Sequence, residues 1–370
     1  MPSQFETDCV IAGAGVIGLA IARALARAGR EVVVVERAKR IGSETSARNS
    51  EVVHAGLYYP EGSLKAEACV AGKEQLYDYL SQRHIPYRQC EKLIVATTPA
   101  DTSRLEDIAR LAAANGVEDL VLLDASRARA LEPEISAEAA LRSPSTGILD
   151  SHAYMLSLLG EAEDHGAVLA LGQTIVAGEA RADGRIDLFC DGADPCRLRA
   201  NIFVNAAGLW APALANRMEG FPQDQVPGQY FAKGNYFALS GPAPFTRLIY
   251  PVPSGGGLGV HLTFDLAGQA RFGPDMEWVE RIDYRVNEGR IALFYDAVRK
   301  YWKGLADGAL QPAYSGIRPR ISGPDEPPAD FVISGTVDHG LAGQIHLFGI
   351  ESPGLTASLD LAQRVSALVT

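Results

Sequence analysis

Residues 8–36 read DCVIAGAGVIGLAIARALARAGREVVVVE, and this stretch decides the fold. It opens as an apolar strand, passes through a glycine-rich turn into an amphipathic helix pattern, and ends in four consecutive valines between two glutamates. A continuous apolar run of this kind is typical of a strand buried on both faces of a parallel sheet. The pattern therefore predicts a β-α-β opening, with strands over 8–12 and 31–36 and a helix over 16–28 that stops at Gly29.

The turn Gly13-Ala14-Gly15-Val16-Ile17-Gly18 fits the spacing GxGxxG between a strand and a helix. The first glycine permits a tight turn, the second lets a pyrophosphate approach the backbone, and the third lets helix and strand pack closely. The helix N-terminus then directs its N–H groups and its positive end at the phosphates. Glu36 follows at the end of the second strand, where an acid accepts hydrogen bonds from ribose hydroxyls. We predict a dinucleotide site.

The β-α-β unit alone does not separate NAD from FAD. Arg37, directly after Glu36, could indicate a 2′-phosphate, but the Glu36 carboxylate would repel one.

The remaining pattern predicts further β/α units at both ends of the chain and an antiparallel sheet of short strands over 228–272. The expected fold class is α/β with an α+β second lobe: a Rossmann-like dinucleotide-binding domain with an interleaved antiparallel-sheet substrate domain. The first domain is expected over 1–85, 147–220 and 321–370, and the second over 86–146 and 221–320. Further helices are predicted over 66–83, 102–115, 154–165, 284–302 and 356–368, and strands over 92–97, 167–171, 173–176, 203–204 and 344–348.

Composition narrows the function classes. The 370 residues are 47% hydrophobic and 21% charged, with a net charge of −11, which argues against a nucleic-acid partner because phosphate backbones call for a basic surface. The five cysteines form no CxxC, so we expect neither a metal nor a disulfide. The N-terminal sequence shows no signal peptide, and no run of 18 apolar residues occurs. We expect a cytoplasmic protein, with peripheral contact to the inner face of a membrane as an alternative.

Three further segments resemble the FAD-dependent D-amino-acid oxidase and glycerol-3-phosphate dehydrogenase superfamily: residues 43–56, 205–211 and 349–356. The resemblance implies FAD as cofactor, with the first segment along the pyrophosphate, the second beneath the FAD, and the third over the pyrimidine edge of the flavin. With the glycine turn, the expected cofactor-binding residues are Gly13, Gly15, Val16, Ile17, Gly18, Glu36, Arg37, Ser46, Ala47, Arg48, Asn49, Ser50, His54, Val176, Ala206, Ala207, Gly208, Trp210, Gly349, Ile350, Glu351, Pro353, Gly354, Leu355 and Thr356.

Within that superfamily the chain looks most like the L-2-hydroxyglutarate dehydrogenase group. The residues that carry this likeness are 48–60, 233–237, 250–253, 257–263 and 316–319. The likeness implies oxidation of a small 2-hydroxy acid to the 2-oxo acid by hydride transfer to flavin N5.

Such a reaction needs a cation for the substrate carboxylate and a base for the hydroxyl proton. Arg318 is the candidate cation because a guanidinium binds a carboxylate through two hydrogen bonds, with a surface salt bridge as the alternative. His261, in a strand-like pattern, is the candidate base, or else a sheet histidine satisfied by a hydrogen bond. His54 could be a covalent flavin tether, a base or a non-covalent contact. Tyr58 and Tyr250 could bind substrate through their hydroxyls, or serve packing.

Other functions share these features in part. An oxidase of glycine or sarcosine would use the same flavin and arginine, and a glycerol-3-phosphate enzyme would need more cations in the pocket. A non-catalytic FAD-binding protein would leave Arg318 and His261 without a task, and an NAD-only dehydrogenase would not need residues 349–356. The electron acceptor is expected to be a quinone, an electron-transfer protein or oxygen.

Overall fold

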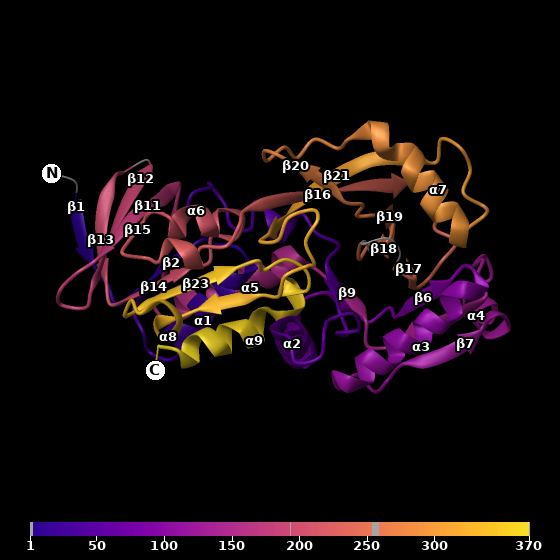
Figure 1. Ribbon diagram of the computed structural model, residues 1–370, viewed down its shortest axis with the longest axis horizontal. Helices are drawn as coiled ribbons and strands as arrows, with labels where there is room; N and C mark the ends of the chain where they lie inside the picture. Colours follow the sequence, from indigo (N-terminus) through magenta and orange to yellow (C-terminus); the bar gives the residue numbers. More distant parts are fainter. Residues whose placement is uncertain (1–2, 193, 254–258, 370) are drawn as a thin grey trace. The chain divides into compact units, whose positions relative to one another are not determined.

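The computed structural model describes residues 3–192, 194–253 and 259–369 and separates into two compact units. Unit 1 contains Met1–Ala47, Ser151–Phe231 and Arg318–Thr370, and unit 2 contains Arg48–Asp150 and Ala232–Ile317. Each unit is assembled from separated stretches of chain, as the colours in Figure 1 show. Each is described by itself below.

The centre of unit 1 is a sheet in which five strands run parallel and the last runs antiparallel to its neighbour. Valine-rich β3 lies inside this sheet, as its continuous apolar run predicts. In spatial order the strands are β10 (Val168–Leu171), β3 (Val32–Glu36), β2 (Cys9–Ala12), β14 (Ile202–Asn205), β23 (Gln344–Phe348) and β22 (Val332–Ser334).

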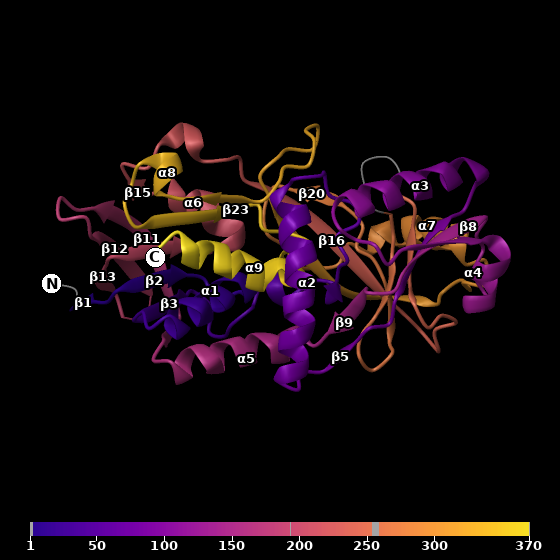
Figure 2. The same cartoon turned by 90° about the horizontal axis from the view of Figure 1, so that it is seen from below.

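Helices lie on one side of this sheet, and a second sheet with a short helix lies on the other. The helix α1 (Val16–Arg27) packs between α5 (Ser151–Asp164) and α9 (Gly354–Ala367), and Figure 2 shows the three helices next to one another. The opposite layer shares an apolar core with the central sheet. It consists of β1 (Ser3–Glu6), β13 (Cys196–Ala200), β12 (Ile186–Gly192), β11 (Gln173–Ala180), β15 (Met218–Glu219) and the helix α6 (Ala211–Ala215).

Unit 2 is built on a large, mainly antiparallel sheet. The pairing between β17 and β6 inside this sheet is parallel. The strand order is β20 (Glu277–Val279), β16 (Tyr230–Leu239), β19 (Ala270–Phe272), β18 (Leu262–Phe264), β17 (Leu248–Pro251), β6 (Lys92–Ala96), β8 (Ala139–Ser143) and β7 (Val121–Asp124), and β21 (Leu310–Arg320) pairs with β16.

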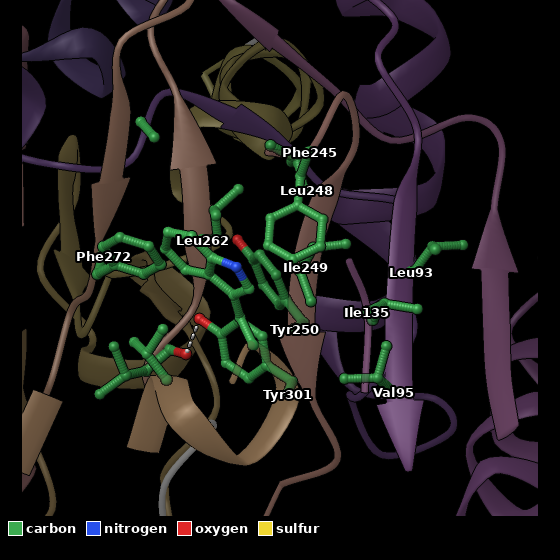
Figure 3. Packing of buried hydrophobic residues seen from close by; sticks show 14 of the residues in the cluster. Leu93, Val95, Ile135, Phe245, Leu248, Ile249, Tyr250, Leu262, Phe272 and Tyr301 are labelled. Carbon is green, nitrogen blue, oxygen red and sulfur yellow. Dashed lines mark hydrogen bonds between the residues drawn. The ribbon is translucent and has the colours of Figure 1, made fainter. Parts of the chain in front are cut away.

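Alternate residues of β6 enter two different cores of unit 2. Leu93 and Val95 join a cluster that includes Tyr250 and Tyr301, shown in Figure 3, where the Tyr301 hydroxyl donates to the Val260 carbonyl oxygen at 3.2 Å. The helices α4 (Ala125–Leu131) and α7 (Ile291–Tyr301) contribute side chains to that cluster. Ile94 and Ala96 instead join a second cluster with side chains of α3 (Pro99–Ala114). The period of two along a strand explains this division.

The predicted domain boundaries differ from the observed units. Residues 48–85, expected in the dinucleotide-binding domain, lie in unit 2. There β4 (Val52–Val53) pairs with β9 (Gly147–Leu149), which also pairs with β5 (Tyr87–Arg88), and the long helix α2 (Leu64–Gln82) follows in the same unit. Residues 147–150 are therefore held in unit 2 as well, whereas 221–231 and 318–320 belong to unit 1. Hydrogen bonding between strands that are distant in the sequence sets these boundaries. A local sequence pattern does not predict such pairing.

Most predicted elements are confirmed within a few residues, among them β2, α1, β3, α2, β6, α3, α5, β10, β14, β23 and α9. The helix predicted over 284–302 is half wrong, because the helix α7 begins only at Ile291 after a short 3₁₀ turn (η4, Glu288–Arg290). His261 directly precedes β18 rather than lying within it, and Gly259, two residues earlier, has a φ of +77°. Gly257 and Leu258 of that motif lie outside the described residues.

In the described part of the chain, no helix combines the length and the apolar character that crossing a bilayer requires.

Candidate active site

The loop between β2 and α1 carries the glycines of the predicted dinucleotide motif. Gly13 has a φ of +103°, and a Cβ atom there would lie 2.7 Å from the carbonyl oxygen of Ala206. A Cβ atom on Gly18 would lie 2.0 Å from the carbonyl oxygen of Gly13. Internal packing therefore excludes a side chain at both positions. The Ala206 N–H also donates to the Ala12 carbonyl oxygen at 3.0 Å, which places the predicted 206–208 turn beside the glycine loop.

Gly15 is different, because the protein itself leaves space beside it. Its φ is −77°, and a Cβ atom would meet one described atom within 4 Å, the Ser46 Oγ at 3.0 Å. The helix α1 begins directly after it without a side-chain cap from Gly15, and the Val16 N–H donates to the Ser46 Oγ at 3.0 Å. Bare backbone at the positive end of a helix fits the pyrophosphate of a dinucleotide, so the residues present suit such a cofactor.

Glu36 stands where the sequence places it, and both of its carboxylate oxygens hold the backbone. Its Oε2 accepts from the Ala14 N–H and its Oε1 from the Ala38 N–H, each at 2.8 Å. Each carboxylate oxygen accepts about two hydrogen bonds, so capacity for ribose hydroxyls remains. Glu36 therefore shapes the glycine loop in addition to its predicted contact with ribose.

Arg37 and Trp210, both predicted to bind the cofactor, contact each other. The Arg37 guanidinium lies 4.1 Å from the centre of the Trp210 ring, and its Nη2 pairs with the Glu44 Oε1 at 2.5 Å. The Trp210 Nε1 donates to the Glu44 Oε2 at 3.1 Å. The Glu44 carboxylate is therefore the partner of Arg37 in this structure, and the cofactor contacts predicted for Arg37 and Trp210 stay predictions.

The C-terminal glycine turn precedes α9, whose first turn packs beside that of α1. Gly349 has a φ of +69°, and the helix starts at Gly354 without a side-chain cap. A Cβ atom on Gly354 would lie 2.8 Å from the Ile350 Cγ2 and 3.9 Å from the Ile17 Cδ1. Glu351 is ion-paired with Arg320 at 3.1 Å, and Thr356 is fully buried. Unit 1 thus holds the glycine turn and the C-terminal turn at adjacent helix starts.

The polar residues after Ala47 are anchored within unit 2. The Arg48 guanidinium lies 4.2 Å from the Tyr284 ring centre, the Asn49 carbonyl accepts from the Tyr314 hydroxyl at 2.6 Å, and the Ser50 Oγ lies 2.9 Å from the Tyr236 hydroxyl. A Cβ atom on Gly316 would lie 1.9 Å from the Arg48 carbonyl oxygen, which explains the glycine before Arg318. The predicted cofactor contacts of residues 48–50 stay predictions.

The candidate base lies against a candidate substrate residue. The rings of His261 and Tyr250 are stacked, with centroids 3.5 Å apart and planes inclined by 7°. Both residues are nearly inaccessible, at 4% and 2% exposure. Burial raises the pKa of the Tyr250 hydroxyl well above its ordinary value, so this hydroxyl stays protonated and able to donate.

Lys92, which sequence reasoning did not select, lies among the predicted residues of unit 2. Its Nζ is 4.8 Å from the centre of the Tyr250 ring and 5.2 Å from that of Tyr58. The side chain is 1% exposed, and desolvation lowers its pKa from 10.5 to about 7. The sequence could have indicated this residue. Lys92 alternates with Ile94 and Ala96, so its side chain lies on the same apolar face of the strand, where burying a lysine costs free energy.

His54 belongs to the same group of side chains. Desolvation, with a smaller contribution from the charge of Lys92, lowers its pKa to about 3, so the imidazole is neutral at physiological pH. The Cys69 thiol donates to the His54 carbonyl oxygen at 3.5 Å. The structure therefore brings His54, Tyr58 and Tyr250 together around Lys92 in unit 2, with His261 stacked on Tyr250.

Arg318 and its neighbour Arg320 have different surroundings. Arg318 is half-buried near the end of β21, within the part of that strand that belongs to unit 1. Arg320 is paired with Glu351 at 3.1 Å, which gives it a structural partner. Val176, also predicted to bind the cofactor, lies at an irregularity in the pairing of β11 with β12.

The glycine cradle, the paired helix starts and the parallel sheet define unit 1 as a dinucleotide-binding domain of the kind found in oxidoreductases. The family model described as FAD dependent oxidoreductase (DAO) matches residues 8–368 of this chain. The chain therefore belongs to that family, and FAD is its cofactor.

Comparison with known proteins adds a near full-length relative. The chain is 44% identical to the mitochondrial L-2-hydroxyglutarate dehydrogenase of Arabidopsis thaliana, over 98% of this chain and 83% of that protein. Among solved structures it resembles the L-alpha-glycerophosphate oxidase of Mycoplasma pneumoniae with FAD bound, with a TM-score of 0.88, 22% identity and 99% and 95% coverage of the two chains. It also resembles glycine oxidase from Geobacillus kaustophilus, with a TM-score of 0.83, 19% identity and 98% and 94% coverage. The structural likenesses confirm the predicted fold class.

Proposed function

We propose that this flavoprotein oxidises a small 2-hydroxy acid of the L-2-hydroxyglutarate type to the corresponding 2-oxo acid. The observation that carries the proposal is the 44% identity to an L-2-hydroxyglutarate dehydrogenase over nearly the whole chain. The buried group of Lys92, His54, Tyr58, Tyr250 and His261 supports it, because the group combines a cation, hydroxyl donors and imidazoles.

A bound FAD would supply, at its N5, the acceptor for the hydride of the substrate Cα. His261 takes the hydroxyl proton, and the stack on Tyr250 fixes the plane of its ring. His54 is the weaker candidate for this task, because a pKa of about 3 makes its imidazole a poor base at neutral pH. The proposal leaves His54 as a contact at the flavin, covalent or not.

Arg318 is proposed to bind the carboxylate next to the reacting carbon. A guanidinium fits a carboxylate through two parallel hydrogen bonds. The neighbouring Arg320 is ion-paired with Glu351, so its guanidinium is assigned to that carboxylate rather than to the substrate.

Anaerobic bleaching of the flavin tests the proposed substrate class. L-2-hydroxyglutarate, D-2-hydroxyglutarate, glycine, sarcosine and glycerol 3-phosphate are added in turn, and the long-wavelength flavin absorbance is followed. We expect rapid bleaching by the L-hydroxy acid alone, and a rise of at least about tenfold in its half-saturating concentration in Arg318→Ala with unchanged flavin content. Bleaching by an amine alone would keep the fold and the cofactor but overturn the substrate class.

We infer further that the electrons pass to a quinone, an electron-transfer protein or oxygen. Rapid-mixing reoxidation of the reduced enzyme with air-saturated buffer and with a soluble quinone separates these acceptors. The cytoplasmic location expected from the sequence stays a prediction, and the name of the Arabidopsis thaliana relative places that protein in mitochondria. Fractionation of cells that express the chain tests this location.

A further inference from the structure

Lys92 is a buried cation that pairs with no anion in the described part of the chain. Its side chain is 1% exposed, and among residues 3–192, 194–253 and 259–369 its ammonium group makes no hydrogen bond and no ion pair. An ammonium carries three donors, and burying such a charge without acceptors costs several kcal/mol in order of magnitude. A protein retains such a group only where something compensates the cost.

The groups that face Lys92 do not compensate its charge. They come from four elements: His54 and Tyr58 from the segment after β4, Cys69 from α2, Tyr250 from β17, and Ser143 from the paired strand β8. None is a carboxylate, and the Ser143 hydroxyl lies 2.9 Å from that of Thr146. The two ring faces attract the ammonium weakly compared with a counter-ion.

The nearest acid along the chain is directed elsewhere. Glu91 directly precedes β6 with a φ of +64°, and its side chain lies beside that of Arg142, which neighbours Leu93 rather than Lys92 in the sheet. There its two oxygens pair with Arg142 at 2.5 Å and with Arg247 at 2.8 Å. The described residues therefore supply two cations to Glu91 and no anion to Lys92.

We propose that Lys92 is a substrate-binding residue that takes a carboxylate, and that it makes the enzyme prefer dicarboxylic over monocarboxylic 2-hydroxy acids. The inference rests on the proposed function and deepens it. Lys92 binds the carboxylate that a monocarboxylic substrate lacks, while Arg318 is assigned to the carboxylate beside the reacting carbon. The hydroxyls of Tyr58 and Tyr250 stay protonated because burial raises their pKa values, and each can donate a further hydrogen bond to the same carboxylate.

The pKa values of these neighbouring groups indicate which of them takes up a proton when the substrate carboxylate binds. His54 is neutral with a pKa lowered to about 3, and Cys69 is neutral with a pKa raised to about 12, so neither changes charge near pH 8. Lys92 alone of this group has a pKa of about 7. An anion that binds it stabilises the charged form, and Lys92 then takes up a proton.

Calorimetric titration of the flavin-loaded enzyme at pH 8 tests the proposal. Glutarate and butyrate are the ligands, because both lack the hydroxyl that the flavin oxidises. We expect glutarate to bind at least about tenfold more tightly than butyrate to the unchanged enzyme. Lys92→Met should reduce this ratio to within about twofold and leave butyrate binding unchanged.

Two controls separate the role of Lys92 from a general effect of burial. Lys233→Met replaces another buried lysine, at 5% exposure, whose Nζ donates to the Arg285 carbonyl oxygen, and it should keep the preference for glutarate. The unchanged enzyme in Tris and in triethanolamine buffer reports proton uptake on binding, and we expect close to one proton with glutarate and none with butyrate. That measurement needs no variant, so it holds even if Lys92→Met fails to fold.

The outcomes also separate this inference from the proposed function. An unchanged preference for glutarate in Lys92→Met, or no proton uptake by the unchanged enzyme, overturns the role of Lys92 even if L-2-hydroxyglutarate bleaches the flavin. Conversely, glutarate binding that depends on Lys92 in an enzyme that no 2-hydroxy acid reduces would support the carboxylate site and overturn the proposed reaction.

Discussion

The two units present ligand-binding groups in opposite ways. Unit 1 offers backbone: the glycine loop around Gly15, and the starts of α1 and α9, whose N-cap residues Gly15 and Pro353 provide no side-chain cap. Unit 2 offers side chains, which include a lysine from a central strand and a histidine stacked on a tyrosine. The side chains of unit 1 near the glycine loop mostly bind one another or the backbone, as Glu36 and Arg37 do.

This difference teaches how each kind of site is encoded. A backbone site depends on residues close together in the sequence, because one turn and one helix start form it. A side-chain site depends on residues far apart, because several strands and helices must bring them together. The first kind fails when a side chain is added, and the second fails when a charge or a ring nitrogen is removed.

The largest expected effect is the loss of flavin when a side chain is added at Gly15. Gly15→Val adds a side chain where a Cβ atom would meet one described atom within 4 Å, the Ser46 Oγ at 3.0 Å, and where the pyrophosphate needs the space. We expect flavin content to fall below about a tenth of normal, with the far-ultraviolet circular dichroism unchanged. Absorbance of the purified protein measures the flavin.

Gly160→Ala is the matched control for this substitution. Gly160 lies in α5, and a Cβ atom there would meet nothing described within 4 Å, so the variant should bind flavin normally. Full flavin content in Gly15→Val would show that the pyrophosphate does not approach the glycine loop. It would contradict the view that unit 1 binds its ligand through backbone groups.

The sequence predicts unit 1 well because its signals are local. The spacing of Gly13, Gly15 and Gly18 and the valines of β3 led to the correct strand, turn and helix. The boundary at residue 48 was not predictable in this way, because it depends on β4 pairing with β9 nearly a hundred residues later. Pairing between distant segments follows from tertiary packing, which a local pattern does not record.

In unit 2 the sequence identifies residues by resemblance but not their grouping. His54, Tyr58, Tyr250 and His261 were selected from separate motifs, and the structure places them near Lys92. From the sequence, Lys92 is predicted only as the first residue of the strand over 92–97. Only the sheet, with its neighbours β17 and β8 on either side, shows that this lysine is enclosed.

The second prediction concerns the ring nitrogens of His261. His261→Phe retains an aromatic ring for the stack on Tyr250 and removes the proton acceptor. We expect flavin reduction at saturating substrate to slow by about 100-fold, the lower end of what a general base contributes, with flavin content unchanged. Stopped-flow absorbance under anaerobic conditions measures the rate.

A control at the other half of the stack sharpens this result. Tyr250→Phe keeps both rings and removes only a hydroxyl, so it should weaken substrate binding while the limiting rate changes little. A normal limiting rate in His261→Phe would transfer the base role to water or His54 and leave His261 as packing.

The smallest expected effect is a gain in stability when Lys92 is replaced. It measures how much the buried charge of the side-chain site lowers the free energy of unfolding. Lys92 has a lower pKa in the folded than in the unfolded protein, about 7 against 10.5, because burial disfavours the charged form. For a base, this shift destabilises the folded state as pH falls below the unfolded value, and the cost is fully present below about pH 7. Lys92→Met has a similar volume and no charge, so it should stabilise the protein by about 1–3 kcal/mol at pH 7.

Thermal unfolding of the flavin-loaded proteins, followed by flavin fluorescence, measures this gain. The midpoint of Lys92→Met should exceed that of the unchanged enzyme by about 2–4 °C per kcal/mol. The gain should shrink between pH 7 and pH 9.5, because the unchanged enzyme increasingly holds Lys92 neutral in that range. A gain independent of pH would indicate improved packing rather than relief of a buried charge. A lower midpoint would show that the ammonium contributes to folding, and the contrast between a self-sufficient backbone site and a costly side-chain site would no longer hold.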